Sequence, residues 1–221
     1  MRAQDVPQSG KRGRTVSVMT KYGLVIRGVP VPKMRATARQ RRARAFMGSM
    51  PGGWRSLSDD QRAAWEPPAS KTKSRKRLGR TGTLRGYHFY NKINCVLAAV
   101  GLPRVTVPPR KPKFPLNPVG SLKINNSRDD LALLLSVPTA PAQYTLVLGS
   151  PPCSAGISCR CGFTILGLLP APVRGLSDIT DLYVKVFGKP PVGSRVFIRT
   201  RQVIDGWEDE PIQTTAIVPG P

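Results

Sequence analysis

The first half of this chain contains very few acidic residues. Residues 1–113 carry 4 Asp and Glu residues against 26 Lys and Arg residues, a balance of +22, whereas residues 114–221 carry 8 against 9. A charge of this size indicates the kind of partner rather than the fold. We therefore expect the first half to bind a polyanion, whose phosphates would neutralise its self-repulsion. The second half is expected to be an ordinary neutral module.

Histidine and long apolar runs are also scarce. His88 is the single histidine, and no window of 18 apolar residues exists, so we predict no transmembrane helix and no membrane partner. The first residues are charged but are not followed by an apolar segment, so we expect no secretory signal. The phosphate-binding glycine loop, G-x-S-x-G and H-E-x-x-H are missing. These absences predict a protein that is not an enzyme and has no cofactor and no metal.

The four cysteines follow no standard metal-binding pattern. Cys95 stands alone, and Cys153, Cys159 and Cys161 have the spacing C-x5-C-x-C. We expect reduced, packed thiols. The alternatives are a disulfide from Cys153 to Cys159 or Cys161, and a metal site.

Residues 1–35 form a basic arm with interspersed Gly and Pro. Residues 15–19 and 22–29 are rich in β-branched side chains, so we predict a loose β-ribbon or an extended arm. Because of its charge and its scattered breakers, the arm is expected to be disordered in the isolated chain.

Residues 36–102 are predicted to form a basic helical unit. Its first helix, residues 36–48, consists of strong helix formers and ends at Gly48. Ala43, Phe46 and Met47 share one face, and arginines surround the rest. A helix without acidic residues is typical of one laid along phosphates, whereas solvated helices mix both signs.

Two further helices are expected in this unit. Ser58 followed by Gln61 predicts a capping box for a second helix, which Pro67 and Pro68 end. Trp54 is placed just before that helix. A third helix is predicted over residues 84–101. Its aromatic residues are expected to pack against Trp54 and Trp65, so the tryptophans are interpreted as core anchors rather than as platforms for bases.

Two basic segments without apolar periodicity complete the first half. Residues 71–80, with six Lys and Arg residues, are predicted to form a loop. Residues 103–118 contain six prolines and are predicted to form a stiff linker that marks the domain boundary. With the first helix, they supply the candidate nucleic-acid-binding residues: Arg35, Arg39, Arg41, Arg42, Arg44, Lys71, Lys73, Arg75, Lys76, Arg77, Arg80, Arg110, Lys111 and Lys113.

Residues 119–221 change to a period-two pattern with Pro- and Gly-rich turns, including one at residues 191–194. This predicts an immunoglobulin- or fibronectin-like antiparallel β-sandwich, and an α+β fold for the whole chain. The predicted strands are Ser121–Asn125, Asp130–Val137, Gln143–Gly149, Arg160–Leu166, Asp181–Phe187, Arg195–Val203 and Gln213–Val218.

An acidic run follows the sixth predicted strand. Asp205, Glu208, Asp209 and Glu210 are placed in a C-terminal loop. We interpret this loop as solvated and as a contact for the basic half of a neighbouring subunit, with cation binding as the alternative.

The order of several residues resembles a group of uncharacterised bacterial and phage-associated proteins. The resemblance covers most of the chain and rests on these positions: Tyr22, Gly23, Val25, Arg27, Thr37, Gln40, Arg44, Phe46, Trp54, Leu57, Gln61, Arg62, Trp65, Gly86, Phe89, Asn91, Gly101, Pro108 and Pro109. It implies a basic part, a Trp-containing helical unit and a C-terminal sandwich. It also implies a virion or prophage context, without assigning an activity.

These observations favour a structural protein of a nucleic-acid-containing assembly, most plausibly a phage virion. Residues 1–113 would bind phosphates or an acidic protein surface, and the sandwich would contact other structural proteins in an oligomeric assembly. We expect it in the virion or the host cytoplasm. The alternatives are a free DNA- or RNA-binding regulator and a ribosome-like, RNA-associated component.

Overall fold

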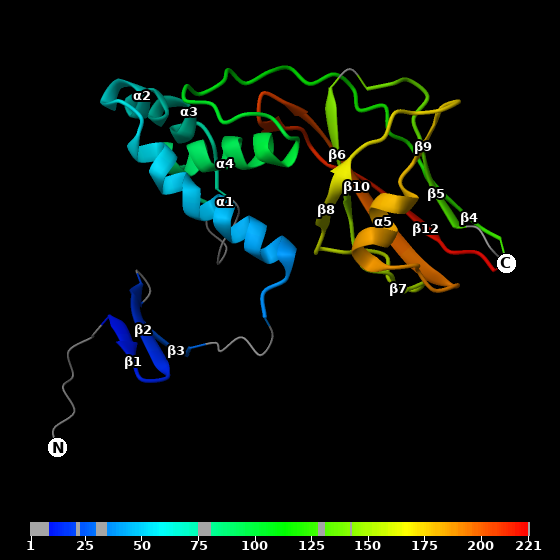
Figure 1. The fold of residues 1–221 in the computed structure, drawn as a ribbon, viewed down its shortest axis with the longest axis horizontal. Helices are drawn as coiled ribbons and strands as arrows, with labels where there is room; N and C mark the ends of the chain where they lie inside the picture. Colours follow the sequence, from blue (N-terminus) through cyan, green and yellow to red (C-terminus); the bar gives the residue numbers. More distant parts are fainter. Residues whose placement is uncertain are drawn as a thin grey trace. The chain divides into compact units, whose positions relative to one another are not determined.

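The computed structural model describes residues 9–20, 23–29, 35–74, 81–127, 131–141 and 143–220. It is a mixed α+β protein with antiparallel sheets, as predicted (Figure 1). The chain divides into two compact units, Met1–Ser49 and Met50–Pro221. Within the described ranges, no helix combines the length and the apolar character needed to span a bilayer.

The first unit contains a three-stranded antiparallel sheet of β1 (Gly10–Arg12), β2 (Thr15–Thr20) and β3 (Gly23–Gly28). Gly13 takes a φ of 58° at the turn between β1 and β2. Val18 pairs with Val25, and both side chains are exposed. The predicted β-ribbon is therefore confirmed for the described residues, while its disorder in isolation stays a prediction.

Helix α1 (Ala38–Arg55) begins at a capping box that sequence reasoning missed. The backbone N–H of Gln40 donates to Thr37 Oγ1 over 3.2 Å, and the N–H of Thr37 donates to Gln40 Oε1 over 3.1 Å. Two backbone donors of the first turn are thus satisfied by side chains, which fixes where the helix starts.

The predicted end of this helix at Gly48 is wrong, because α1 continues through Pro51 to Arg55. Its last turns contain Met50, which is completely buried, and Trp54, which lies within α1 rather than before the second helix. The packing of Met50 and Trp54 offsets the cost of glycines in a helix, about 1 kcal/mol each.

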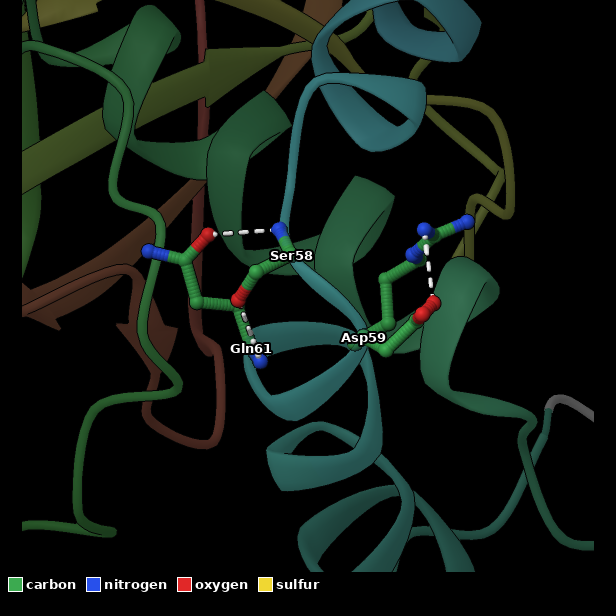
Figure 2. Close-up of polar contacts among 4 residues, drawn as sticks. Ser58, Asp59 and Gln61 are labelled. Carbon is green, nitrogen blue, oxygen red and sulfur yellow. Dashed lines mark hydrogen bonds and ion pairs between the residues drawn. The ribbon is translucent and has the colours of Figure 1, made fainter.

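Three shorter helices follow in the second unit: α2 (Asp59–Ala64), α3 (Glu66–Ser70) and α4 (Gly86–Ala99). Figure 2 shows the capping box of α2, in which the Gln61 N–H donates to Ser58 Oγ (3.2 Å) and the Ser58 N–H donates to Gln61 Oε1 (3.0 Å). Arg62 also pairs with Asp59 at 2.8 Å. The predicted capping box and third helix are confirmed.

Aromatic residues hold these helices together. Trp65 is completely buried. Its ring centroid lies 5.8 Å from that of Phe89 and 5.2 Å from that of Tyr90, and both contacts are edge to face. Trp54 meets Tyr87 at 5.7 Å and Tyr90 at 5.4 Å. Both tryptophans are therefore core anchors, as predicted.

The remaining strands form two antiparallel sheets. One has the order β4-β5-β9, and the other is built around β10, which pairs with β6, β7, β11 and β12, while β8 pairs with β6. Their bounds are β4 (Leu122–Asn126), β5 (Leu131–Ser136), β6 (Tyr144–Gly149), β7 (Cys153–Ser154), β8 (Thr164–Leu168), β9 (Leu176–Asp178), β10 (Ser194–Ile204), β11 (Trp207–Glu208) and β12 (Ile212–Ile217). Six of the seven predicted strands are found, although β8 starts four residues later than expected, and the predicted turn before β10 is confirmed.

The predicted strand Asp181–Phe187 is wrong, because these residues lie in helix α5 (Thr180–Phe187). The N–H of Thr180 donates to Asp178 Oδ1 over 2.9 Å just before the helix, and Gly188, at a φ of 79°, follows its end. Buried Ile179 and Tyr183 are four residues apart, which is helical spacing. The local alternation in Val-Lys-Val-Phe suggested a strand, but the helical spacing of the buried apolar residues favours the helix.

Helices α2 to α5 and the two sheets formed by β4 to β12 belong to one compact unit, Met50–Pro221. A core cluster joins Leu133 and Leu135 of β5 to Val196 and Ile198 of β10 and to Tyr183 of α5. A second cluster joins α4 to β6 and β10 and contains Val96, Val100, Leu146 and Val203. The most compact division of the chain therefore falls at residue 49 rather than within residues 103–118.

The proline-rich segment 103–118 follows the surface of this unit and is held along its length. Asn94 is buried; its amide oxygen accepts the N–H of Val105 (2.8 Å), and its amide nitrogen donates to the Val105 carbonyl (3.3 Å). Further along, Val119 donates to Asn117 (3.1 Å). Prolines keep the segment extended, and these side chains satisfy backbone groups that would otherwise lack partners.

Candidate polyanion-binding groove

One rim of the candidate site is the segment that follows α3. The Thr72 N–H donates to Ala69 O (3.0 Å), and Thr72 Oγ1 donates to Pro68 O (2.9 Å). Lys73 then forms an isolated antiparallel bridge with Thr83. These contacts fix the backbone on which the exposed side chains of Lys71 and Lys73 are carried.

Further hydrogen bonds accompany this bridge between residues 72–74 and 82–84. The Ser74 N–H donates to Gly82 O (2.7 Å), and the Leu84 N–H donates to Thr72 O (3.0 Å). The predicted phosphate ligands Arg75, Lys76, Arg77 and Arg80 lie outside the described residues.

The opposite rim is the proline-rich segment. The indole N–H of Trp65 donates to Thr106 O (2.9 Å), and the indole N–H of Trp207 donates to Pro109 O (3.2 Å). Arg110 and Lys111 follow directly and are exposed. Two tryptophan side chains therefore determine where these cations lie.

Trp207 and Lys92 lie between the two rims. Asp205 (φ 48°) and Gly206 (φ 80°) form the two-residue turn that pairs Trp207 with Ile204, an arrangement typical of a type I′ hairpin. The Trp207 ring packs against Phe89 at 5.2 Å, and Lys92 Nζ lies 5.9 Å from the Trp207 ring centroid. A turn in the sheet and a helix thus meet at this point.

Together these elements enclose a groove with a cavity volume of 710 Å³. Its lining includes five cationic residues from three separate segments and one carboxylate, in addition to four prolines and Trp207: Pro67, Pro68, Lys71, Lys73, Lys92, Pro108, Pro109, Arg110, Lys111, Trp207 and Glu208. A smaller hollow of 480 Å³ shares Lys73, Lys92 and Glu208 with it.

The groove is strongly positive because its carboxylate is already paired. Glu208 Oε1 lies 3.1 Å from Arg201 Nη1, and both side chains are largely buried. In the part of the chain that the structure describes, none of the five groove cations forms an ion pair. Their charge therefore remains available to an anion that enters the groove.

The structure brings four of the predicted binding residues together, namely Lys71, Lys73, Arg110 and Lys111. Lys113 is exposed but does not line the groove. The helical arginines Arg39, Arg41, Arg42 and Arg44, and Arg35 before them, belong to the unit Met1–Ser49, where all five are exposed.

Lys92 and Trp207 are the residues that the sequence-based list omitted. A hairpin was detectable, because Asp-Gly after the apolar pair Val203-Ile204 is a strong signal for a two-residue turn. The prediction that places Glu208 in a loop is wrong, because it lies in β11 beside Arg201. Asp205 is in the turn itself.

The cysteines contribute nothing to the groove. None of the four forms a disulfide; Cys95 and Cys153 are half-buried, and Cys159 and Cys161 are exposed. The alternative disulfide is therefore not formed, and two of the thiols are not packed as expected. Within the described ranges, no three His, Cys, Asp or Glu residues are close enough to hold a metal ion.

Comparison of the chain with protein-family models, with curated proteins and with solved structures found no match.

Proposed function

We propose that this protein is a non-enzymatic structural component of a nucleic-acid-containing assembly that binds phosphates electrostatically. The observation that carries the proposal is the groove, where cations distant in sequence line one cavity and, among the residues that the structure describes, form no ion pair with a carboxylate. Keeping five like charges at one place is unfavourable in the free protein. A bound polyanion would relieve this repulsion and release its own counterions.

The groove fits backbone binding better than base-edge recognition. Its cations lie on a concave surface, whereas reading base edges in a duplex requires a helix or a ribbon that enters the major groove. The exposed arginines of α1 provide a second surface for phosphates in the other unit. Affinity would therefore depend steeply on salt and little on sequence.

The surroundings of His88 support a role without catalysis. His88 is exposed and lines the smaller hollow together with Ser74, Asp209 and Glu210. Among the described residues, however, it forms no hydrogen bond or ion pair with any of them. In this part of the described structure, His88 is therefore not hydrogen-bonded to a nucleophile, which is the arrangement that nucleophilic catalysis requires of a histidine base.

The assembly we propose is a virion or a related particle, on the strength of the basic first half and the resemblance described above. The sheets of the second unit would contact other structural proteins. The finer prediction of an immunoglobulin- or fibronectin-like sandwich stays a prediction. The two sheets share one core, but α5 occupies the place of one expected strand.

The test is a salt series of binding to unrelated duplex DNA and RNA by the full chain and two triple variants. Lys71→Gln, Lys73→Gln and Lys111→Gln remove three groove charges. The control removes three exposed lysines elsewhere: Lys123→Gln, Lys185→Gln and Lys189→Gln. Each variant loses the same net charge, so only the position of the charge differs.

We expect the groove variant to reduce the slope of log K against log salt by about 2 to 3, and the control variant to leave it nearly unchanged. Equal slopes for the two variants would contradict a role for the groove. No binding to either nucleic acid at low salt would overturn the proposed function and direct attention to an acidic protein partner. Strong preference for one sequence would favour a regulator instead.

A further inference from the structure

The aromatic residue in the groove is fixed in a way that leaves only part of its surface available. Trp207 is half-buried, it packs against Phe89 at 5.2 Å, and its N–H is already donated to Pro109 O. The indole is therefore held rigidly and has no free hydrogen-bonding group. Lys92 Nζ lies over the ring, so a base that stacks on the indole takes the place of this ammonium group, and its identity is not read through the indole N–H.

The cations that line the groove with this ring come from three segments of the chain. Lys71 and Lys73 belong to one rim, Arg110 and Lys111 to the other, and Lys92 lies near the ring itself. An apolar ring between charged rims matches a nucleic-acid strand, in which flat bases alternate with phosphates. The 710 Å³ volume is in the range of sites that enclose a small ligand, about one or two nucleotides.

The lining favours a nucleic-acid strand over an acidic peptide. Pro67, Pro68, Pro108 and Pro109 contribute to the walls, and proline has no backbone N–H. A peptide bound in extended form gains much of its affinity from main-chain hydrogen bonds. These walls offer it few donors, whereas the side-chain cations serve phosphates equally well.

A duplex would not use the ring, because the faces of paired bases are covered by their neighbours. We therefore propose that the groove binds an unpaired segment of nucleic acid, with its phosphates on the lysines and Arg110 and one base against Trp207. This inference rests on the proposed function, and it specifies the class of nucleic acid that this groove recognises.

The first experiment uses the unaltered full chain, so it does not depend on any variant folding. Binding is measured to a 12-nucleotide oligothymidine, to an abasic strand of the same length and charge, and to a 12-base-pair duplex at one salt concentration. Stacking of one base contributes enough that the abasic strand should bind about 5- to 150-fold more weakly than oligothymidine. The duplex should also bind more weakly.

A second experiment places the effect at Trp207. Titration with oligothymidine should quench tryptophan fluorescence in the unaltered chain and in the control variant Trp54→Phe. The Trp54 ring contacts Tyr87 and Tyr90 and does not line the groove. In Trp207→Phe the quenching should be lost. Because Trp207→Phe also removes the hydrogen bond to Pro109 O, the affinity of this variant for the abasic strand is measured as well, and its affinity for oligothymidine should fall by the larger factor.

Two outcomes would overturn the inference and leave the proposed function standing. One is equal, salt-dependent binding of oligothymidine and the abasic strand, and the other is quenching that persists in Trp207→Phe. Tighter binding of a 12-residue polyglutamate peptide than of oligothymidine would also overturn it, in favour of a protein partner. Failure to bind any of the strands at low salt would instead refute the proposed function itself.

Discussion

Gly206 lies in the turn before Trp207 and packs against α4. Its replacement by alanine tests how closely this hairpin approaches the helix. A Cβ at position 206 would lie 2.7 Å from Ile93 Cγ2, 2.9 Å from Ile93 O and 3.1 Å from Leu97 Cγ. The backbone also has a φ of 80°, which L-residues rarely adopt. Gly206→Ala therefore combines two separate costs, backbone strain and overpacking.

The two costs can be separated with a matched control. Gly193 has a similar φ of 74°, but nothing lies within 4 Å of its added Cβ, so Gly193→Ala carries the backbone cost alone. That cost is about 1–2 kcal/mol. Overpacking against α4 adds about 1–3 kcal/mol, so Gly206→Ala should lower the free energy of unfolding by about 2–5 kcal/mol.

Urea denaturation of the two variants and the unaltered chain measures this difference. Because the turn positions Trp207, Gly206→Ala should also weaken oligothymidine binding, whereas Gly193→Ala should not. If the two variants were destabilised equally, the close approach of the hairpin to α4 would be refuted.

Three further results are expected. Ser58→Ala removes one half of the α2 capping box and should cost about 0.5–2 kcal/mol in urea denaturation; no change would mean that the box contributes nothing. Asn94→Leu leaves the N–H and carbonyl of half-buried Val105, in the proline-rich segment, without this partner and should cost about 2–4 kcal/mol; a smaller effect would argue that this segment is loosely held. Burial raises the pKa of Cys95, so at pH 8 alkylation followed by mass spectrometry should label exposed Cys159 and Cys161 first, and Cys95 faster as the pH rises; early labelling of Cys95 would contradict its burial.

Local chemistry made several elements predictable. The capping box at Ser58, the aromatic helix that follows residue 84 and the period-two strands depend on neighbours within a few residues, and each is found. Elements whose ends depend on distant contacts were predicted wrongly. Helix α1 continues past Gly48 because Met50 and Trp54 are packed, and α5 replaces a strand because its apolar residues face the core between the sheets.

The sequence by itself determined the charge division of this protein, since the number and order of ionisable residues do not depend on folding. It also identified most of the cations that line the groove. Only the tertiary structure decided that Lys71, Lys92 and Arg110 lie around Trp207, because α3, α4, the proline-rich segment and the β10–β11 turn meet there. The physical reason is that these segments are joined by long-range packing of Trp65, Phe89 and Trp207, which no local pattern records.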